Sequence, residues 1–346
     1  MKPTVLKGKL TIVLLLLLPV LALSGCGGEA AGPAPTSTTA GEPTAITAAP
    51  TPTTATVEAT PTTVTAEETP TTEVAGGEAT TTAGAEGGVV QPGATPVSDW
   101  KPGKYANSIP APAKLVTGGE LTVGSDVSYP PQEYMDASGR PIGVDIDIAE
   151  EIASRLGLQL KVINFKFDNL LPALQAGQFD VIVSAMTITD ERKQVVDFVP
   201  YFEAGQAVLV KKGNPAGIKT LDDLSGKTAV AQQGTTEETT LKDLNTKFES
   251  EGKTKINILT YPSDTDAVDQ LRIGRAEATL HDSPVAAYYS KLYPEFEVAI
   301  PNFDSAPEGI AVAKNNAEML STIQKAIDAM KADGTIAQIN GKWGVK

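Results

Sequence analysis

Residues 179–193 read Phe-Asp-Val-Ile-Val-Ser-Ala-Met-Thr-Ile-Thr-Asp-Glu-Arg-Lys, and this stretch decides the fold class. The apolar run from Phe179 to Ala185 predicts a buried strand. Thr189 is a typical helix N-cap, and the Asp-Glu pair that follows it suits the positive end of a helix dipole. A strand that leads through a short polar loop into a capped helix is typical of an α/β fold.

The same alternation extends on both sides of this stretch. Before it, we expect strands and helices at residues 121–123, 145–156, 158–162 and 169–176. Asp145 and Asp168 are the expected caps of the two helices. After it, we expect elements at residues 207–211, 221–224, 228–231, 257–260, 265–274, 278–280, 284–291, 317–330 and 335–343. Two such sets predict two lobes with mainly parallel sheets, and ligands of such folds bind beyond the carboxyl ends of strands.

Composition excludes several classes of function. The 346 residues carry 28 Lys and Arg, 42 Asp and Glu, and a formal net charge of −14. An acidic chain without a basic block is a poor partner for nucleic acid, because phosphate contacts need clustered cations. The single Cys and the single His exclude an internal disulfide and metal sites rich in either residue. We therefore expect no nucleic-acid partner, no metal and no cofactor.

The first 25 residues predict a lipoprotein signal peptide. Lys residues precede an apolar stretch over 10–23, which is shorter than the about 20 residues that span a bilayer as a helix. A short membrane anchor is the alternative. Leu23-Ser24-Gly25-Cys26 resembles the bacterial lipobox, which implies cleavage before Cys26 and attachment of lipid to its thiol. We expect the protein in the cell envelope, lipid-anchored on the extracytoplasmic face of the membrane.

Residues 26–104 predict a disordered linker rich in Thr, Pro, Ala and Gly. Its acidic residues have no Lys or Arg among them up to residue 99, so the segment repels itself and buries little apolar surface. Thr with Pro also suits O-glycosylation. We expect lobe 1 over 105–204 together with 301–346, and lobe 2 over 205–300. Two crossing strands near Gly205 and Asn302 are the expected hinge.

Polar residues that follow the predicted strands suit a free amino acid. Such a ligand carries a carboxylate and an ammonium on one carbon, so its site needs a cation or N–H donors opposite an anion. Arg192 offers a planar fork for a carboxylate. Backbone N–H groups near Thr236, at a helix start, offer a second anion site. Asp282 offers an acceptor to the ammonium.

Several segments together resemble the family 3 extracellular solute-binding proteins, the amino-acid receptors of ABC importers. They are 124–131 (GSDVSYPP), 143–147 (GVDID), Phe167, 184–193 (SAMTITDERK), 232–236 (QQGTT), 280–284 (LHDSP) and 333–343. The resemblance covers about residues 115–346. It implies a two-lobed periplasmic-binding-protein-like α/β fold of type II, with a mixed sheet flanked by helices in each lobe and a two-strand hinge. It also implies a monomer that passes its ligand to an ABC permease and ATPase.

The resemblance also implies roles for individual residues. Arg192, Thr187 and Thr236 would bind the carboxylate, and Asp282 with Ser184 or Ala185 the ammonium. Tyr129 and Phe167 resemble aromatic walls around the ligand side chain. The full expected ligand-binding set is Asp126, Tyr129, Phe167, Ser184, Ala185, Thr187, Arg192, Thr235, Thr236 and Asp282.

Asp126 bears on which amino acid is bound. In the family this position often meets the ligand side chain, and a carboxylate there disfavours glutamate and aspartate by repulsion. The segment around Asp282 resembles glutamine receptors most closely. Gln232, however, stands where some glutamine receptors have Lys, and Gln132 stands where an aromatic residue is common. The sequence therefore leaves glutamine, arginine, lysine and histidine open.

Two other functions compete with this interpretation, and some residues have ordinary structural explanations. A dehydratase on the same fold would hold a small carboxylic acid at Arg192 and use Asp126 as acid or base, but would leave Asp282 unpaired. A ligand-sensing lipoprotein is the second alternative. We expect a binding protein and no catalytic residue. We expect His281 to be structural, Asp145 to be a cap and Asp147 to lie on a helix surface.

Overall fold

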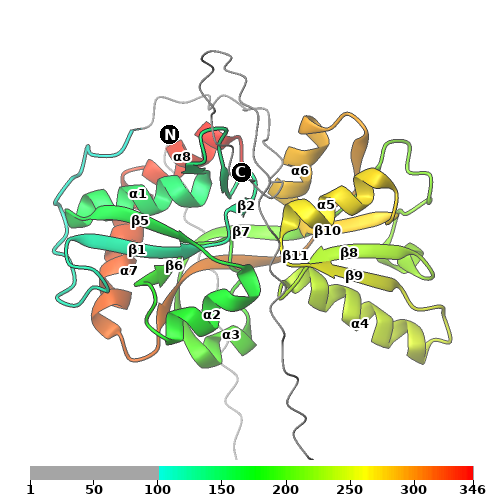
Figure 1. Cartoon of the computed structure of the whole chain (residues 1–346), viewed down its shortest axis with the longest axis horizontal. Helices are drawn as coiled ribbons and strands as arrows, with labels where there is room; N and C mark the ends of the chain where they lie inside the picture. Colours follow the sequence, from blue (N-terminus) through cyan, green and yellow to red (C-terminus); the bar gives the residue numbers. More distant parts are fainter. Residues whose placement is uncertain (1–100, 346) are drawn as a thin grey trace, which may run out of the picture. The chain divides into compact units, whose positions relative to one another are not determined.

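The computed structural model describes residues 101–345 (Figure 1). An eight-stranded sheet has the strand order β5-β1-β6-β11-β7-β10-β8-β9, and a three-stranded sheet has the order β2-β3-β4. The strands are β1 (Glu120–Ser125), β2 (Ser128–Tyr129), β3 (Glu133–Met135), β4 (Pro141–Ile142), β5 (Gln159–Asn164), β6 (Val181–Ile182), β7 (Val196–Lys211), β8 (Thr228–Gln232), β9 (Asn257–Tyr261), β10 (Ala278–Asp282) and β11 (Phe296–Ala313).

Helices cover the sheet in two groups (Figure 1). The helices are α1 (Val144–Leu156), α2 (Phe167–Gln175), α3 (Asp190–Val195), α4 (Thr236–Ser250), α5 (Asp264–Ile273), α6 (Ser283–Leu292), α7 (Ala317–Ala332), α8 (Thr335–Trp343) and the 3-10 helix η1 (Leu221–Leu224). One hydrophobic core joins β1 to α1 and α7 through residues such as Val123, Ile148 and Ile323. Another joins β8 to α4 through Ala231 and Leu241.

Two long antiparallel strands, β7 and β11, connect the two lobes (Figure 1). On one side β1 pairs in parallel with β5 and β6, and on the other β8 pairs in parallel with β9 and β10. β7 and β11 run against their other neighbours, β10 and β6. The expected two-lobed α/β fold with a mixed sheet is confirmed. The expectation of mainly parallel pairing is wrong for the crossing strands.

The crossing strands come close together at Gly205. The pairing of β7 with β11 is irregular here, between Phe303 opposite Gln206 and Ala306 opposite Ala204. A Cβ atom at Gly205 would collide with the side-chain oxygen of Asn302 and approach the carbonyl oxygen of Phe303. The two strands therefore pass each other where the hinge is expected. The lobe boundaries at 205 and 301 stay a prediction.

Some helix starts differ from the sequence-based expectation. Thr189 caps α3 as expected, and Thr235, rather than Thr236, caps α4; their side chains accept from the backbone N–H groups of Arg192 and Glu238. Asp145 is not a cap, because the N-cap position of α1 is occupied by Gly143, whose φ of 138° and tight approach to Gln132 require glycine. The cap of α2 is Lys166 rather than Asp168, so that helix begins earlier than expected.

Strand lengths differ as well. The expected strand over 179–185 shortens to Val181–Ile182, because the chain turns away to form the loop before α3. Strand β11 contains the crossing strand expected near Asn302, whereas the small sheet β2-β3-β4 is not among the expected elements. The signal peptide, Cys26 and most of the expected linker lie outside the described residues. Among residues 101–345, no helix has the length and apolar character needed to cross a membrane.

Candidate functional site

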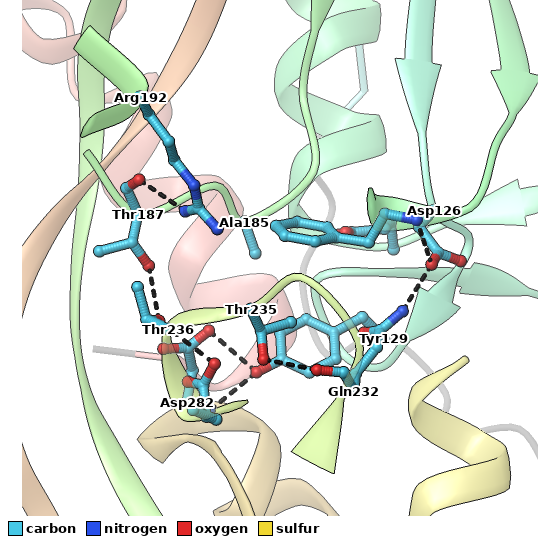
Figure 2. A pocket seen from close by; sticks show the side chains of 12 residues that line it. Asp126, Tyr129, Ala185, Thr187, Arg192, Gln232, Thr235, Thr236 and Asp282 are labelled. Carbon is cyan, nitrogen blue, oxygen red and sulfur yellow. Dashed lines mark hydrogen bonds between the residues drawn. The ribbon is translucent and has the colours of Figure 1, made fainter. Parts of the chain in front are cut away.

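A pocket of about 310 Å³ collects residues from both sides of the crossing strands (Figure 2). Its lining residues are Asp126, Tyr129, Glu133, Phe167, Ala185, Thr187, Arg192, Gln232, Thr235, Thr236, Glu237 and Asp282. All of the expected ligand-binding residues except Ser184 are among them.

Ser184 lies behind the pocket and supports its wall. Its hydroxyl accepts a hydrogen bond from the backbone N–H of Asp126 at 3.0 Å and donates to Glu133 Oε1 at 2.8 Å. The side chain therefore holds two lining residues in place. Its expected contact with the ligand stays a prediction.

Arg192 forms the cationic side of the pocket. Its guanidinium donates to the carbonyl of Thr187 at 2.7 Å and to that of Gly234 at 3.1 Å, and its central carbon lies 5.3 Å from the centre of the Phe167 ring. Burial lowers the pKa of Arg192, and the nearby carboxyls of Glu237 and Asp282 oppose this effect. An arginine stays charged in such a setting, so its remaining N–H groups suit a carboxylate.

The start of α4 lies beside Arg192. Thr236 is the first residue of this 15-residue helix, and its hydroxyl lies 3.4 Å from that of Thr187 (Figure 2). The first turn of a helix presents backbone N–H groups and the positive end of the helix dipole. Arg192, Thr187 and the start of α4 thus form one anion-binding corner.

Asp282 forms the opposite, anionic side. Its Oδ2 accepts a hydrogen bond from the Tyr129 hydroxyl at 2.9 Å, and its backbone N–H donates to that hydroxyl at 2.8 Å. Asp282 stands at the N-cap position of α6 but makes no side-chain capping bond there. Burial first, and then the charge of Glu237, raise the pKa of Asp282 well above its usual range.

Asp126 closes the far end of the pocket, away from Arg192 (Figure 2). Its carboxylate accepts from Ser128 Oγ at 2.9 Å, from the backbone N–H of Phe167 at 3.1 Å and from Gln232 Nε2 at 2.6 Å. Burial raises the pKa of Asp126 to about 6, while these donors and Lys166 lower it. The group is therefore mostly ionised at pH 7.

Additional carboxyls lie at and behind the pocket. Glu133 lines it, and burial together with the charge of Asp145 raises the pKa of Glu133 well above its usual range. Asp145 accepts from the Tyr201 hydroxyl and from the backbone N–H of Ala185, each at 2.7 Å, and burial raises its pKa to about 6. Glu308 on β11 has its pKa raised well above the usual range, mainly by burial. Asp145 therefore supports the wall at Ala185.

Glu133, Gln232 and Glu237 line the pocket but are not in the expected ligand-binding set, although Gln232 was considered in the comparison with glutamine receptors. Glu237 directly follows Thr236 in the first turn of α4, and that adjacency was the available signal. Gln232 is the last residue of β8, just before the Gly-Thr-Thr segment. Nothing in the sequence pattern marks Glu133, because the short hairpin that places it was not predicted.

His281, Asp147 and Gln132 lie outside the pocket lining. His281 is buried, and its Nδ1 lies 2.7 Å from Asp264 Oδ1. Asp147 is buried rather than on a helix surface, because Lys342 and Trp343 of α8 donate to its Oδ2. Within residues 101–345, no His, Cys, Asp or Glu group has an arrangement that could hold a metal ion.

The family model for bacterial extracellular solute-binding proteins, family 3, matches residues 121–346. The chain belongs to this family. The L-cystine-binding protein TcyJ of Escherichia coli K12 is 33% identical to this family 3 protein over 66% of the present chain and 84% of TcyJ. A solved structure of an ancestral arginine-binding protein bound to arginine is 42% identical, with a TM-score of 0.61, and covers 65% of this chain and 98% of that one.

Another solved structure is that of an ancestral amino-acid-binding protein described as a precursor of cyclohexadienyl dehydratase. It is 39% identical with a TM-score of 0.60 and covers 65% of this chain and 95% of that one. These neighbours agree with the two-lobed fold of the family 3 protein. All three are named as binding proteins, although the last is also named as a forerunner of an enzyme.

Proposed function

We propose that this family 3 protein binds a free amino acid between its two lobes and presents it to an ABC importer outside the cytoplasm. One observation carries the proposal. A partly buried cation, Arg192, and a buried carboxyl, Asp282, lie in one pocket of about 310 Å³. This arrangement gives the carboxylate and the ammonium of one amino acid separate partners of opposite charge.

The preferred ligand is a basic amino acid. Arg192 is the only cation among the lining residues that the structure describes, whereas Asp126, Glu133, Glu237 and Asp282 are acidic. A zwitterion with a neutral side chain leaves the charge of Asp126, which is mostly ionised at pH 7, without a cationic partner. A cationic side chain at the far end would pair with Asp126, and a stacking contact with an aromatic wall would add roughly 0.5–2 kcal/mol.

Glutamine is the competing ligand. Its side-chain amide can donate to Asp126, but Gln232 Nε2 already donates to that carboxylate at 2.6 Å. A neutral amide would therefore exchange one hydrogen bond for a similar one. A cationic group gains a charged hydrogen bond, which is roughly twice as strong as a neutral one, so we infer a preference for arginine or lysine.

Ligand binding favours the closed arrangement of the lobes. Three hydrogen bonds already join the two lobes across the pocket. They run from Arg192 to Gly234, from Gln232 to Asp126 and from Tyr129 to Asp282. A ligand that contacts both sides adds to these bonds only when the lobes are closed. It shifts the equilibrium by no more than its difference in affinity for the two states.

We further infer that the protein works as a lipid-anchored monomer that binds its ligand without converting it. Lipid on Cys26 and the Thr- and Pro-rich linker would hold the binding lobes near the permease. A substrate that lacks an amine would leave Asp282 without a cationic partner inside the pocket. This argument favours a binding protein over a dehydratase for small carboxylic acids.

Calorimetric titration tests the proposed function. The protein is unfolded and refolded to remove bound ligand and then titrated with each standard amino acid. We expect a basic amino acid to bind with a dissociation constant near micromolar, about −8 kcal/mol. Arg192→Ala should abolish this binding, and Arg275→Ala, an exposed residue outside the pocket lining, should not. Turnover of a carboxylic acid without amino-acid binding would favour the enzyme instead.

A further inference from the structure

Two buried carboxyls stand side by side at the ammonium end of the pocket. Asp282 is 6% exposed and Glu237 is 4% exposed, and they lie within hydrogen-bonding reach of each other. Glu237 Oε1 receives no hydrogen bond from any residue that the structure describes. Two carboxylates cannot bond directly because neither can donate, so a bond between them requires a proton.

The groups around this pair leave its charge poorly compensated. Arg192 is the cation that faces both carboxyls, and it already donates to two carbonyls. The Tyr129 hydroxyl donates to Asp282, and the Thr236 hydroxyl donates to Glu237 Oε2 at 3.2 Å.

A third carboxyl, Glu308 of β11, also faces the pair and adds like charge. Burial and Glu237 raise the pKa of Asp282 more than Arg192 and Tyr129 lower it. Burial and the neighbouring negative charges therefore favour a bound proton at Asp282.

We propose that Asp282 and Glu237 share one proton when the pocket holds no amino acid, and that the ammonium group of the ligand displaces this proton on binding. The O–H bond within the pair breaks and the proton passes to the buffer. The ammonium then donates to both freed carboxylates, so charge and protons balance. The inference rests on the proposed function and adds Glu237 to the ammonium site as a second acceptor.

Calorimetry in two buffers counts the released protons. The purified, ligand-free protein is titrated with L-arginine at pH 8 in phosphate and in Tris, which differ in ionisation enthalpy. At this pH Asp126, with its pKa of about 6, contributes little release. The difference in measured enthalpy should correspond to release of about one proton. Between pH 7 and 8 the affinity should rise by up to tenfold, because protons compete with the ligand.

Two variants test whether the proton released on ligand binding comes from Asp282 and Glu237. Glu237→Gln should reduce the release at pH 8 below that of the unmodified protein and flatten the pH dependence of affinity, because it removes the like charge beside Asp282 while the burial of Asp282 remains. Glu249→Gln on the same helix, which is exposed, should leave both unchanged. Tight arginine binding without proton release by the unmodified protein would overturn the inference and leave the proposed function standing. Equal release from Glu237→Gln would also overturn it, whereas absence of amino-acid binding would overturn both.

Discussion

Replacing Asp126 with Asn tests how the pocket recognises the ligand side chain. The carboxylate is 3% exposed and holds three hydrogen bonds, from Ser128, Phe167 and Gln232. A ligand cation about 4 Å away would gain about 4 kcal/mol at an effective dielectric constant near 20. Removal of one partner from a buried charge pair costs about 2–5 kcal/mol. Asp126→Asn should therefore weaken arginine binding by about 30-fold to several thousandfold.

Glutamine provides the comparison within the same variant. Its neutral amide loses at most one hydrogen bond, which contributes about 0.5–1.5 kcal/mol, or roughly tenfold in affinity. Calorimetric titration of the unmodified protein and Asp126→Asn with both ligands measures the difference, and Asp243→Asn on the exposed face of α4 serves as control. An equal loss for both ligands would refute the charge argument.

The ligand-free variant gives an independent check of the same carboxyl. The pKa of Asp126 is raised from 3.8 to about 6 in the folded protein, so the unfolded chain releases this proton first as pH rises. The contribution of this carboxyl to the free energy of unfolding is complete below pH 3.8 and is lost as the pH rises through 6. The loss corresponds to about 3 kcal/mol at most. Ligand-free Asp126→Asn should therefore melt no lower than the unmodified protein at pH 7.

Three further substitutions follow from the fold and the pocket. Gly205→Ala should lower the free energy of unfolding by about 1–3 kcal/mol in denaturant titration, because its Cβ meets Asn302, whereas Gly341→Ala, with open space in α8, should not destabilise. Gln232→Lys should weaken arginine binding more than glutamine binding in calorimetry, since its ammonium would pair with Asp126; a greater loss for glutamine would contradict this. Glu133→Gln should change the melting temperature at pH 7 little, because the raised pKa keeps the carboxyl protonated, and a fall of ten degrees would show that it is ionised.

The sequence predicted the capped helices and the strands with clear periodicity. Thr189 and Thr235 act through their own local backbone, so their roles follow from neighbouring residues alone. Asp145 looked equally suited to a cap. Its actual partners, Ala185 and Tyr201, lie far away in the chain, and only tertiary packing places them there.

The pocket also contains residues that sequence motifs predicted and residues that only tertiary packing brings into it. Arg192, Thr236 and Asp282 belong to motifs that directly follow strands or begin helices, and the structure brings them together in one pocket. Glu133 enters the same pocket from a short hairpin whose strands have two or three residues, which is too little for any periodic pattern. Its pairing with Ser184 therefore could not be read from the chain.

A crystal structure of the protein with L-arginine bound would test the central claim most directly. We expect the ligand carboxylate to bond to Arg192 and the start of α4, its ammonium to lie between Asp282 and Glu237, and its guanidinium to reach Asp126. A ligand in the reversed orientation, with its carboxylate away from Arg192, would contradict the account. So would electron density for arginine anywhere outside this pocket.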